Sequence, residues 1–247
     1  SIVAAIEEGR AVFDNVRKFM TYILTSNIPE IVPYLAFALL GIPLPLTIIQ
    51  ILAIDLGTDM VPALALGAER PHPDVMARPP RPRAQRLLDA PLLLRAYAFL
   101  GPFEALAAMA AYAFVLAAGG WAWGQALAAD DPLYLQATTA CLAAVVVAQV
   151  VNVFLCRSEV ESAFAGSPLA NRLILWGVVT EIALILLVVY TAPGQALFAT
   201  APLPAAVWLF MLPFVLLMLA AEEGRKAIVR RAVDKRKRAC NPHGVRI

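Results

Sequence analysis

The sequence predicts an all-α membrane protein built as a bundle of six transmembrane helices. Of its 247 residues, 61% are hydrophobic, and the mean hydropathy of +0.73 is far above that of an average soluble domain. The apolar residues fall in runs of about 20, the length that an α-helix needs to cross a bilayer. The six predicted spans cover approximately residues 19–40, 45–67, 95–118, 133–155, 172–190 and 205–221.

The segments outside the spans define the expected organisation. Residues 1–18 are amphipathic with helical spacing and are expected to form a cytoplasmic stalk, whereas residues 222–247 form a basic cytoplasmic tail. The first two spans are joined only by residues 41–44, so we expect them to form an antiparallel helical hairpin. The sequence opens at Ser1 inside a helical pattern, and we expect it to be a piece of a longer protein.

The basic residues predict the topology. All 20 Lys and Arg residues lie in the stalk, in the second and fourth loops with their junctions to the next span, or in the tail. The first, third and fifth loops have none. By the positive-inside rule both termini are cytoplasmic, in agreement with an even number of spans. We therefore expect a multi-pass protein of the plasma membrane, with the lipid bilayer as its surroundings and no nucleic-acid partner.

Carboxylates inside the spans point to function. A charged group at bilayer depth costs about 3 kcal/mol even on a lenient scale, and no Lys or Arg lies in the interior of a span to compensate for it. Carboxylates in such surroundings must be protonated, hydrated or bound to cations. The acids within the predicted spans are Glu30, Asp55, Asp59, Glu104 and Glu181.

Neutral oxygen ligands accompany these acids. Ser26 and Asn27 share a helical face with Glu30, Thr58 is adjacent to Asp59, and Gln149 and Asn152 are three residues apart on the fourth span. Such oxygens suit hard cations such as Na⁺, K⁺, Ca²⁺ or Mg²⁺, and neither the cysteines nor the histidines have the spacing of a soft-metal site. Glu104 either lines a path to the site or reaches interfacial water, and it is left unassigned.

Helix breakers stand beside the acids. Pro29 and Pro33 flank Glu30, and each removes a helical hydrogen bond and frees a carbonyl oxygen upstream. Gly57 and Pro62 are expected to open the backbone around the two aspartates in the same way. Freed carbonyl oxygens at membrane depth can coordinate ions where they line a site.

Several motifs at these positions resemble those of a known family. The segments EGRAVFDNVRK at 8–18, TSNIPE at 25–30, IPLPL at 42–46, IDLGTDMVPA at 54–63 and MARPPR at 76–81 resemble the C-terminal membrane half of type II P-type cation ATPases. These motifs most resemble those of the Na⁺,K⁺/H⁺,K⁺ ATPase group. The later spans match mainly in number and in scattered polar positions.

The resemblance implies that the six spans are the fifth to tenth helices of a ten-helix pump. It implies that Ser26, Asn27, Glu30, Asp55 and Asp59 hold two cation sites, and that Tyr22, Thr58, Gln149 and Glu181 hold an extra sodium site. Asn152 stands where the Na⁺,K⁺ pump has an aspartate that contributes to its sites. The implied ligand is the transported cation, which is Na⁺, K⁺ or Ca²⁺, with ATP and Mg²⁺ acting only through cytoplasmic domains outside this sequence.

The resemblance also implies partners and alternatives. The implied partner is the N-terminal part of the same pump, with its first four helices and cytoplasmic domains. A third loop as short as residues 119–132 disfavours an accessory β subunit. The DKTGT motif with the catalytic aspartate is missing, so we expect no catalytic residues here and no ATP hydrolysis by this chain alone. A stand-alone secondary carrier or channel, or a truncated non-catalytic membrane subunit, remains the alternative.

Overall fold

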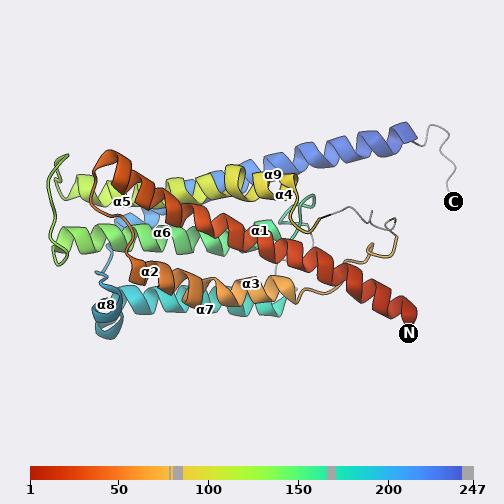
Figure 1. Cartoon of the computed structure of the whole chain (residues 1–247), viewed down its shortest axis with the longest axis horizontal. Coiled ribbons are helices and arrows are strands. Elements are labelled where there is room, and N and C mark those ends of the chain that lie inside the picture. Colours follow the sequence, from red (N-terminus) through yellow and green to blue (C-terminus); the bar gives the residue numbers. More distant parts are fainter. Residues whose placement is uncertain (78, 80–85, 166–170, 241–247) are drawn as a thin grey trace.

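Six long apolar helices run side by side along the longest axis of the molecule (Figure 1). The computed structural model describes residues 1–77, 79, 86–165 and 171–240, and within these residues all regular secondary structure is helical. This confirms the predicted six-helix bundle. The helices that are long and apolar enough to cross a membrane cover Ile2–Leu40, Ile48–Gly67, Ala90–Ala118, Pro132–Cys156, Arg172–Tyr190 and Ala205–Val233.

Two of these spans contain a stretch of π-helix. The second span consists of α2 (Ile48–Ala53), the π-helix η1 (Ile54–Thr58) and α3 (Met60–Gly67). The third consists of α4 (Ala90–Leu93), the π-helix η2 (Leu94–Leu100) and α5 (Gly101–Ala118). Single π-helical turns within α-helices are rare and occur frequently at functional sites. The other elements are α1 (Ile2–Leu40), α6 (Pro132–Cys156), α7 (Arg172–Tyr190), the short α8 (Ala192–Phe198) and α9 (Ala205–Cys240).

The helix ends follow from local sequence signals. Gly41 ends α1 in the left-handed conformation, with φ 63°, and its N–H donates to the carbonyl of Phe37. At the start of α6, the Asp131 side chain accepts a hydrogen bond from the N–H of Leu133, and Pro132 occupies the first helical position. Asn171 caps α7 in the same way. These caps place the ends of the spans where the polar residues interrupt the apolar runs.

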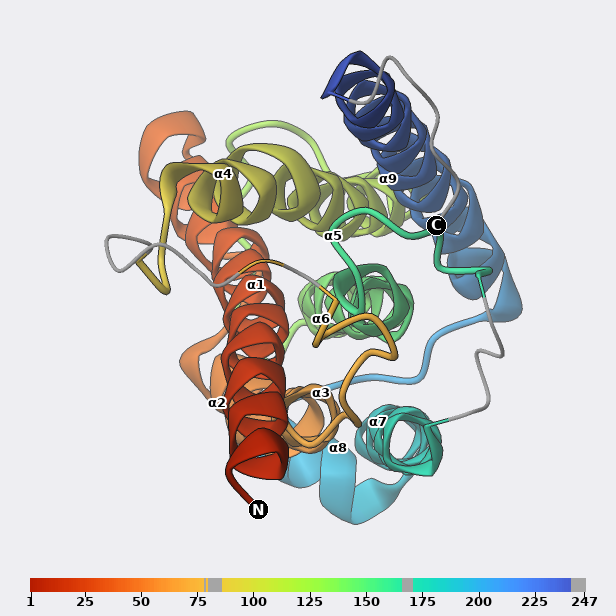
Figure 2. The same cartoon turned by 90° about the vertical axis from the view of Figure 1, so that its right-hand side faces the viewer.

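Helix α6 lies at the centre of the bundle when the molecule is viewed end-on (Figure 2). It is the most deeply buried of the six spanning helices. It packs closely against α5 because both helices present alanines to each other, which lets their backbones approach as membrane helices often do. The buried alanines of this cluster include Ala108 and Ala111 on α5 and Ala140, Ala143 and Ala144 on α6.

Helix α1 is a single helix of 39 residues that includes the predicted stalk and the first span. It remains α-helical through Pro29 and Pro33. The helix does not unwind at these prolines, but each lacks an N–H donor and so still frees a carbonyl oxygen upstream. The structure instead opens the helical ladder on the second span, at η1.

The start of α1 and the end of α9 lie at the same end of the bundle (Figure 1), where the loops are fastened to α1 by ion pairs. Arg17 is mostly buried, and its guanidinium contacts the carboxylates of Asp89 at 2.8 Å and of Glu159 at 3.0 Å. It also donates to the carbonyl of Leu87 at 3.1 Å. The hydrogen bond from Arg17 holds the pKa of Asp89 below its usual range. One arginine thus connects α1 to the loop before α4 and to the loop after α6.

Candidate cation-binding site

The site is organised around Asp59, which lies between η1 and α3. Its N–H donates to the carbonyl of Ile54, five residues back, at 2.9 Å, so the α-helical ladder is widened by one residue at this point. The side chain of Asp59 is 2% exposed and points into the bundle. Gly57 lies within the π-helical stretch. The backbone irregularity that the sequence predicts around the aspartates is therefore present on this span.

Helix α1 supplies the hydroxyl groups that face Asp59. Tyr22 is completely buried, and its hydroxyl donates to Oδ1 of Asp59 over 3.4 Å. Ser26, one helical turn further along, lies beside the same carboxylate. The sequence predicted this face of α1 to line the site, and the structure places both side chains there.

Helix α6 adds two amide side chains. Gln149 donates through Nε2 to the hydroxyl of Ser26 at 3.1 Å, and its Oε1 lies 3.5 Å from the hydroxyl of Thr58. Asn152 accepts a hydrogen bond from the thiol of Cys156 at 3.3 Å, but its Nδ2 has no partner within the described structure. Residues from three spans are thus joined in one buried polar network.

Helix α7 contributes Glu181 from the opposite side. This side chain is 0% exposed, and neither of its carboxylate oxygens has a hydrogen-bond partner in the described residues. It lies beside Tyr22 and within electrostatic range of Asp59. Buried polar atoms in native proteins nearly always have partners, so this unpaired carboxylate is a candidate for binding a ligand.

The remaining predicted residues lie at the edge of the bundle rather than inside it. Asn27 and Glu30 are partly buried, and Asp55 is exposed. Glu30 lies beside Asp55, and its Oε1 is buried without a partner in the described structure. The structure thus divides the ten predicted residues into an inner compartment and an outer edge. The inner compartment comprises Tyr22, Ser26, Thr58, Asp59, Gln149, Asn152 and Glu181, and the outer edge comprises Asn27, Glu30 and Asp55.

The sequence interpretation did not assign Glu104, and the structure places it in the inner compartment. It is 0% exposed on α5, and both its carboxylate oxygens lack partners in the described residues. It faces Asn152 and lies within electrostatic range of Asp59 and Glu30. The signal available in the sequence was an in-span carboxylate shortly after Gly101–Pro102, but sequence alone does not show which side of the helix faces the other acids.

The chemistry of these groups suits a hard cation. The charged neighbours of Glu30, Asp59, Glu104 and Glu181 are other carboxyl groups, and no Lys or Arg of the described residues is among them. Within the same part of the chain, no three His, Cys, Asp or Glu side chains are gathered tightly enough to chelate a metal by themselves. A bound ion therefore also needs the hydroxyl, amide and carbonyl oxygens of this network, which are ligands that hard cations accept.

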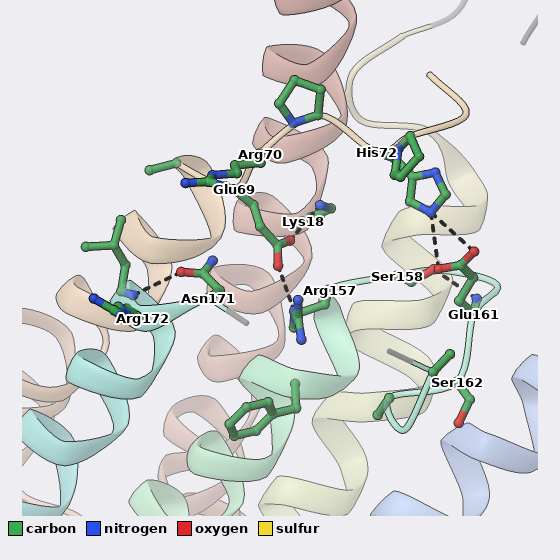
Figure 3. A pocket seen from close by; sticks show the side chains of 17 residues that line it. Lys18, Glu69, Arg70, His72, Arg157, Ser158, Glu161, Ser162, Asn171 and Arg172 are labelled. Atoms are coloured by element: carbon green, nitrogen blue, oxygen red, sulfur yellow. Dashed lines mark hydrogen bonds and ion pairs between the residues drawn. The ribbon is translucent and has the colours of Figure 1, made fainter. Parts of the chain in front are cut away.

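A cavity of about 700 Å³ lies away from these acids, at the end of the bundle where α1 begins (Figure 3). Glu69 holds its wall together by pairing with Lys18 at 2.7 Å and with Arg157 at 2.7 Å. Burial raises the pKa of Glu69, but the two cations outweigh burial and hold that pKa below its usual value. On the other side of the cavity, His72 contacts Glu161 at 3.3 Å. These charged groups of the wall are thus engaged in loop-to-helix and loop-to-loop contacts.

Comparisons with known proteins identify the family. Residues 43–228 match the family model described as cation transporting ATPase, C-terminus. Similar proteins include the sodium/potassium-transporting ATPase subunit alpha-2 of Gallus gallus, 37% identical, the subunit alpha of Tetronarce californica, 33% identical, and the subunit alpha-4 of Homo sapiens, 35% identical. These matches cover 94%, 94% and 95% of this chain, but the chain spans only about a quarter of the length of these relatives, 25% of each. The chain therefore belongs to the cation-transporting P-type ATPases, and it corresponds to the C-terminal membrane domain of such a pump.

Proposed function

We propose that this chain binds and translocates the transported cations of an ATP-driven pump. Ions occupy the inner compartment between α1, η1, α6 and α7, where Asp59 and Glu181 supply negative charge. Ser26, Thr58, Gln149 and Asn152 supply neutral oxygen atoms. Tyr22 bridges the two acids from α1.

One observation carries this proposal, namely the set of buried carboxylates that have no basic partner in the described structure. Removing one partner of a buried ion pair leaves a charge that destabilises a protein by several kcal/mol, about 3–5. Asp59 and Glu181 have carboxyl neighbours instead of Lys or Arg, and both oxygens of Glu181 are unpaired within the described residues. A cation, or a proton in its absence, removes this penalty. The site is therefore most stable when it is loaded.

The outer edge gives a reason to expect further helices beside this bundle. Asp55 is exposed on the same span as Leu52, Leu56 and Met60, which are 46%, 68% and 47% exposed. Exposed apolar side chains of this size suit a lipid or helix contact, but an exposed carboxylate at the same depth does not suit lipid. We propose that the first four helices of the same pump cover this edge and complete a second ion position with Asn27, Glu30 and Asp55.

Energy enters from outside this chain in the proposed mechanism. ATP and Mg²⁺ act in the cytoplasmic domains of the pump, and the stalk part of α1 carries their movement toward Ser26 and Glu30. The π-helix η1 is the element in which the ligand arrangement changes, because its widened ladder makes the backbone of Asp59 easier to shift than that of a regular helix. The end at which α1 begins faces the cytoplasm, and we propose the plasma membrane as the location.

Sodium and potassium are the proposed ions. The relatives are named sodium/potassium-transporting ATPases, and the inner compartment offers amide and hydroxyl oxygens in larger number than carboxylates. Calcium is the alternative that the experiment must exclude.

The test uses the full-length pump in membrane vesicles, with ATP hydrolysis measured against NaCl, KCl and CaCl₂. Asp59→Asn removes the buried charge, and Asp130→Asn changes an exposed acid in the loop before α6 and serves as the matched control. We expect Asp59→Asn to abolish cation-stimulated hydrolysis, whereas Asp130→Asn retains it. Full stimulation of the Asp59→Asn variant, or ion uptake by the wild type in the absence of ATP, would refute the proposal.

A further inference from the structure

Glu104 is the buried carboxylate that the proposed mechanism leaves unused. It lies in the first turn of α5, is 0% exposed, and has two unpaired oxygens within the described structure. A glutamate that only supported the fold would have hydrogen-bond partners or a cation beside it, as Glu222 has in Arg95 at 2.7 Å. Glu104 has neither among the described residues, so its environment matches that of Glu181 rather than that of a structural ion pair.

The groups that face Glu104 belong to the inner compartment. Its polar neighbour on α6 is Asn152, whose Nδ2 is also unpaired in the described structure. Glu181 and Asp59 both lie within its electrostatic range. An ion between Glu104 and Asn152 would meet a carboxylate from α5 and an amide oxygen from α6, and the Asn152 oxygen accepts a hydrogen bond from the weak thiol donor of Cys156.

The backbone next to Glu104 resembles the backbone next to Asp59. The N–H of Gly101 donates to the carbonyl of Ala96, five residues back, where η2 meets α5. Pro102 follows within the first turn and has no N–H to give. Asp59 thus directly follows η1, and Glu104 lies about one turn after the end of η2. Such stretches are rare, and two of them adjoining buried carboxylates at one site support a functional role for both acids.

Close packing brings this part of α5 against α1. A Cβ atom on Gly101 would lie 2.6 Å from Cγ1 of Ile28, so only glycine permits this approach. Ile28 directly follows Ser26 and Asn27 along the chain. The third span is therefore held directly against the ligand-bearing segment of the first.

We propose that Glu104 is a cation ligand of the pump, and that with Asn152 it forms a subsite on the α5–α6 side of the inner compartment that takes a hard cation of the Na⁺ or K⁺ class. This inference rests on the proposed function. It adds a carboxylate from the third span to a site that the sequence interpretation drew from the first, second, fourth and fifth spans.

The experiment replaces Glu104 in the full-length pump and measures the NaCl and KCl concentrations that give half-maximal ATP hydrolysis. We expect Glu104→Gln to raise the half-maximal concentration of at least one of these salts by about tenfold or more, because a neutral amide replaces a charged ligand. Glu104→Asp keeps the charge and should restore part of the affinity. Tyr112→Phe removes another buried polar group of α5, one that donates to the carbonyl of Pro43, and should leave both concentrations within about twofold of the wild type.

The variants separate this inference from the proposed function. If Asp59→Asn abolishes stimulation but Glu104→Gln leaves both half-maximal concentrations unchanged, Glu104 is not a ligand and only this inference fails. If Asp59→Asn also has no effect, the proposed function itself fails. If Glu104→Gln folds poorly, the cation affinity of Glu104→Asp is measured in its place. Wild-type cation affinities in a folded Glu104→Gln variant would overturn the cation-ligand role, even if the pH dependence of its activity changed.

Discussion

The contact between Gly101 and Ile28 gives a prediction whose size follows from the structure. In Gly101→Ala the new Cβ would lie 2.6 Å from Cγ1 and 2.7 Å from Cβ of Ile28, and 2.9 Å from the carbonyl oxygen of Ala96. Carbon atoms are in favourable contact at about 3.5–4.0 Å, so α5 and α1 must separate by about 1 Å. Overpacking of this kind costs about 1–3 kcal/mol, whereas alanine returns at most about 1 kcal/mol through its better helix propensity.

The expected result of Gly101→Ala is therefore a net loss of stability together with a loss of affinity. Ligand distances in ion sites tolerate changes of only about 0.2 Å, and a separation about five times larger at Ile28 must disturb the neighbouring Ser26 and Asn27. We expect an increase of about tenfold or more in the half-maximal cation concentration for ATP hydrolysis, because misplacement by about 1 Å costs up to about a hundredfold in comparable sites.

The assay combines thermal inactivation with cation titration of the ATPase. Gly224→Ala on α9 is the matched control, because a Cβ atom there would meet no atom of another described element within 4 Å. The double variant Gly101→Ala/Ile28→Gly removes the side chain that the new methyl group would strike, and it should recover part of the lost affinity. If Gly101→Ala were as stable and as cation-sensitive as Gly224→Ala, the close approach of α1 and α5 would not exist as described.

Two further predictions concern single side chains. Tyr22→Phe removes the hydroxyl that contacts Asp59 at 3.4 Å. Because this hydrogen bond is long, we expect the same titration to show a loss of cation affinity of only about threefold to tenfold. An unchanged affinity would show that Tyr22 is not part of the site. Glu69→Gln should lower thermal stability at pH 7 and flatten its decline in acid. The depressed pKa of Glu69 means that its pairing with Lys18 and Arg157 stabilises the fold above the unfolded-state pKa of about 4.3 and is lost as the pH falls through the lower folded-state value. Glu8→Gln, at an exposed position, should follow the wild-type pH curve, and an equal decline in all three proteins would contradict the role of Glu69.

The number and order of the spans could be predicted because both rest on signals that add up over many residues. Runs of about 20 apolar residues and the placement of all 20 Lys and Arg outside the span interiors are such signals. The candidate acids could be found for a related reason, since a carboxylate in an apolar run stands out at any position.

The division of the site could not be predicted in the same way. Periodicity shows which residues share a face of one helix, but not which neighbour that face meets. Asp55 and Asp59 are four residues apart, and in a regular helix they would lie on one face. In the structure Asp59 is buried and Asp55 is exposed, so the two carboxylates have different surroundings although η1 brings them within one turn of each other. Glu104 is likewise buried on the side of α5 that faces the other acids, which the sequence alone does not show.

The prolines of α1 show that a local sequence signal can also predict an irregularity that the fold does not adopt. Their missing N–H groups predicted an interrupted helix, yet α1 is continuous from Ile2 to Leu40. A proline in a helix interior costs about 3 kcal/mol, and α1 stays helical because the other interactions along its 39 residues outweigh that cost.

This continuity, together with the ion pairs of Arg17, makes α1 a lever. The Arg17 contacts with Asp89 and Glu159 fix the helix near its middle. At about 1.5 Å per residue, Ile2 lies about 22 Å from that fulcrum on one side and Glu30 about 20 Å on the other. The two arms are nearly equal, so in the proposed pump a sideways push at the stalk would move the candidate ion ligands by a similar distance in the opposite direction.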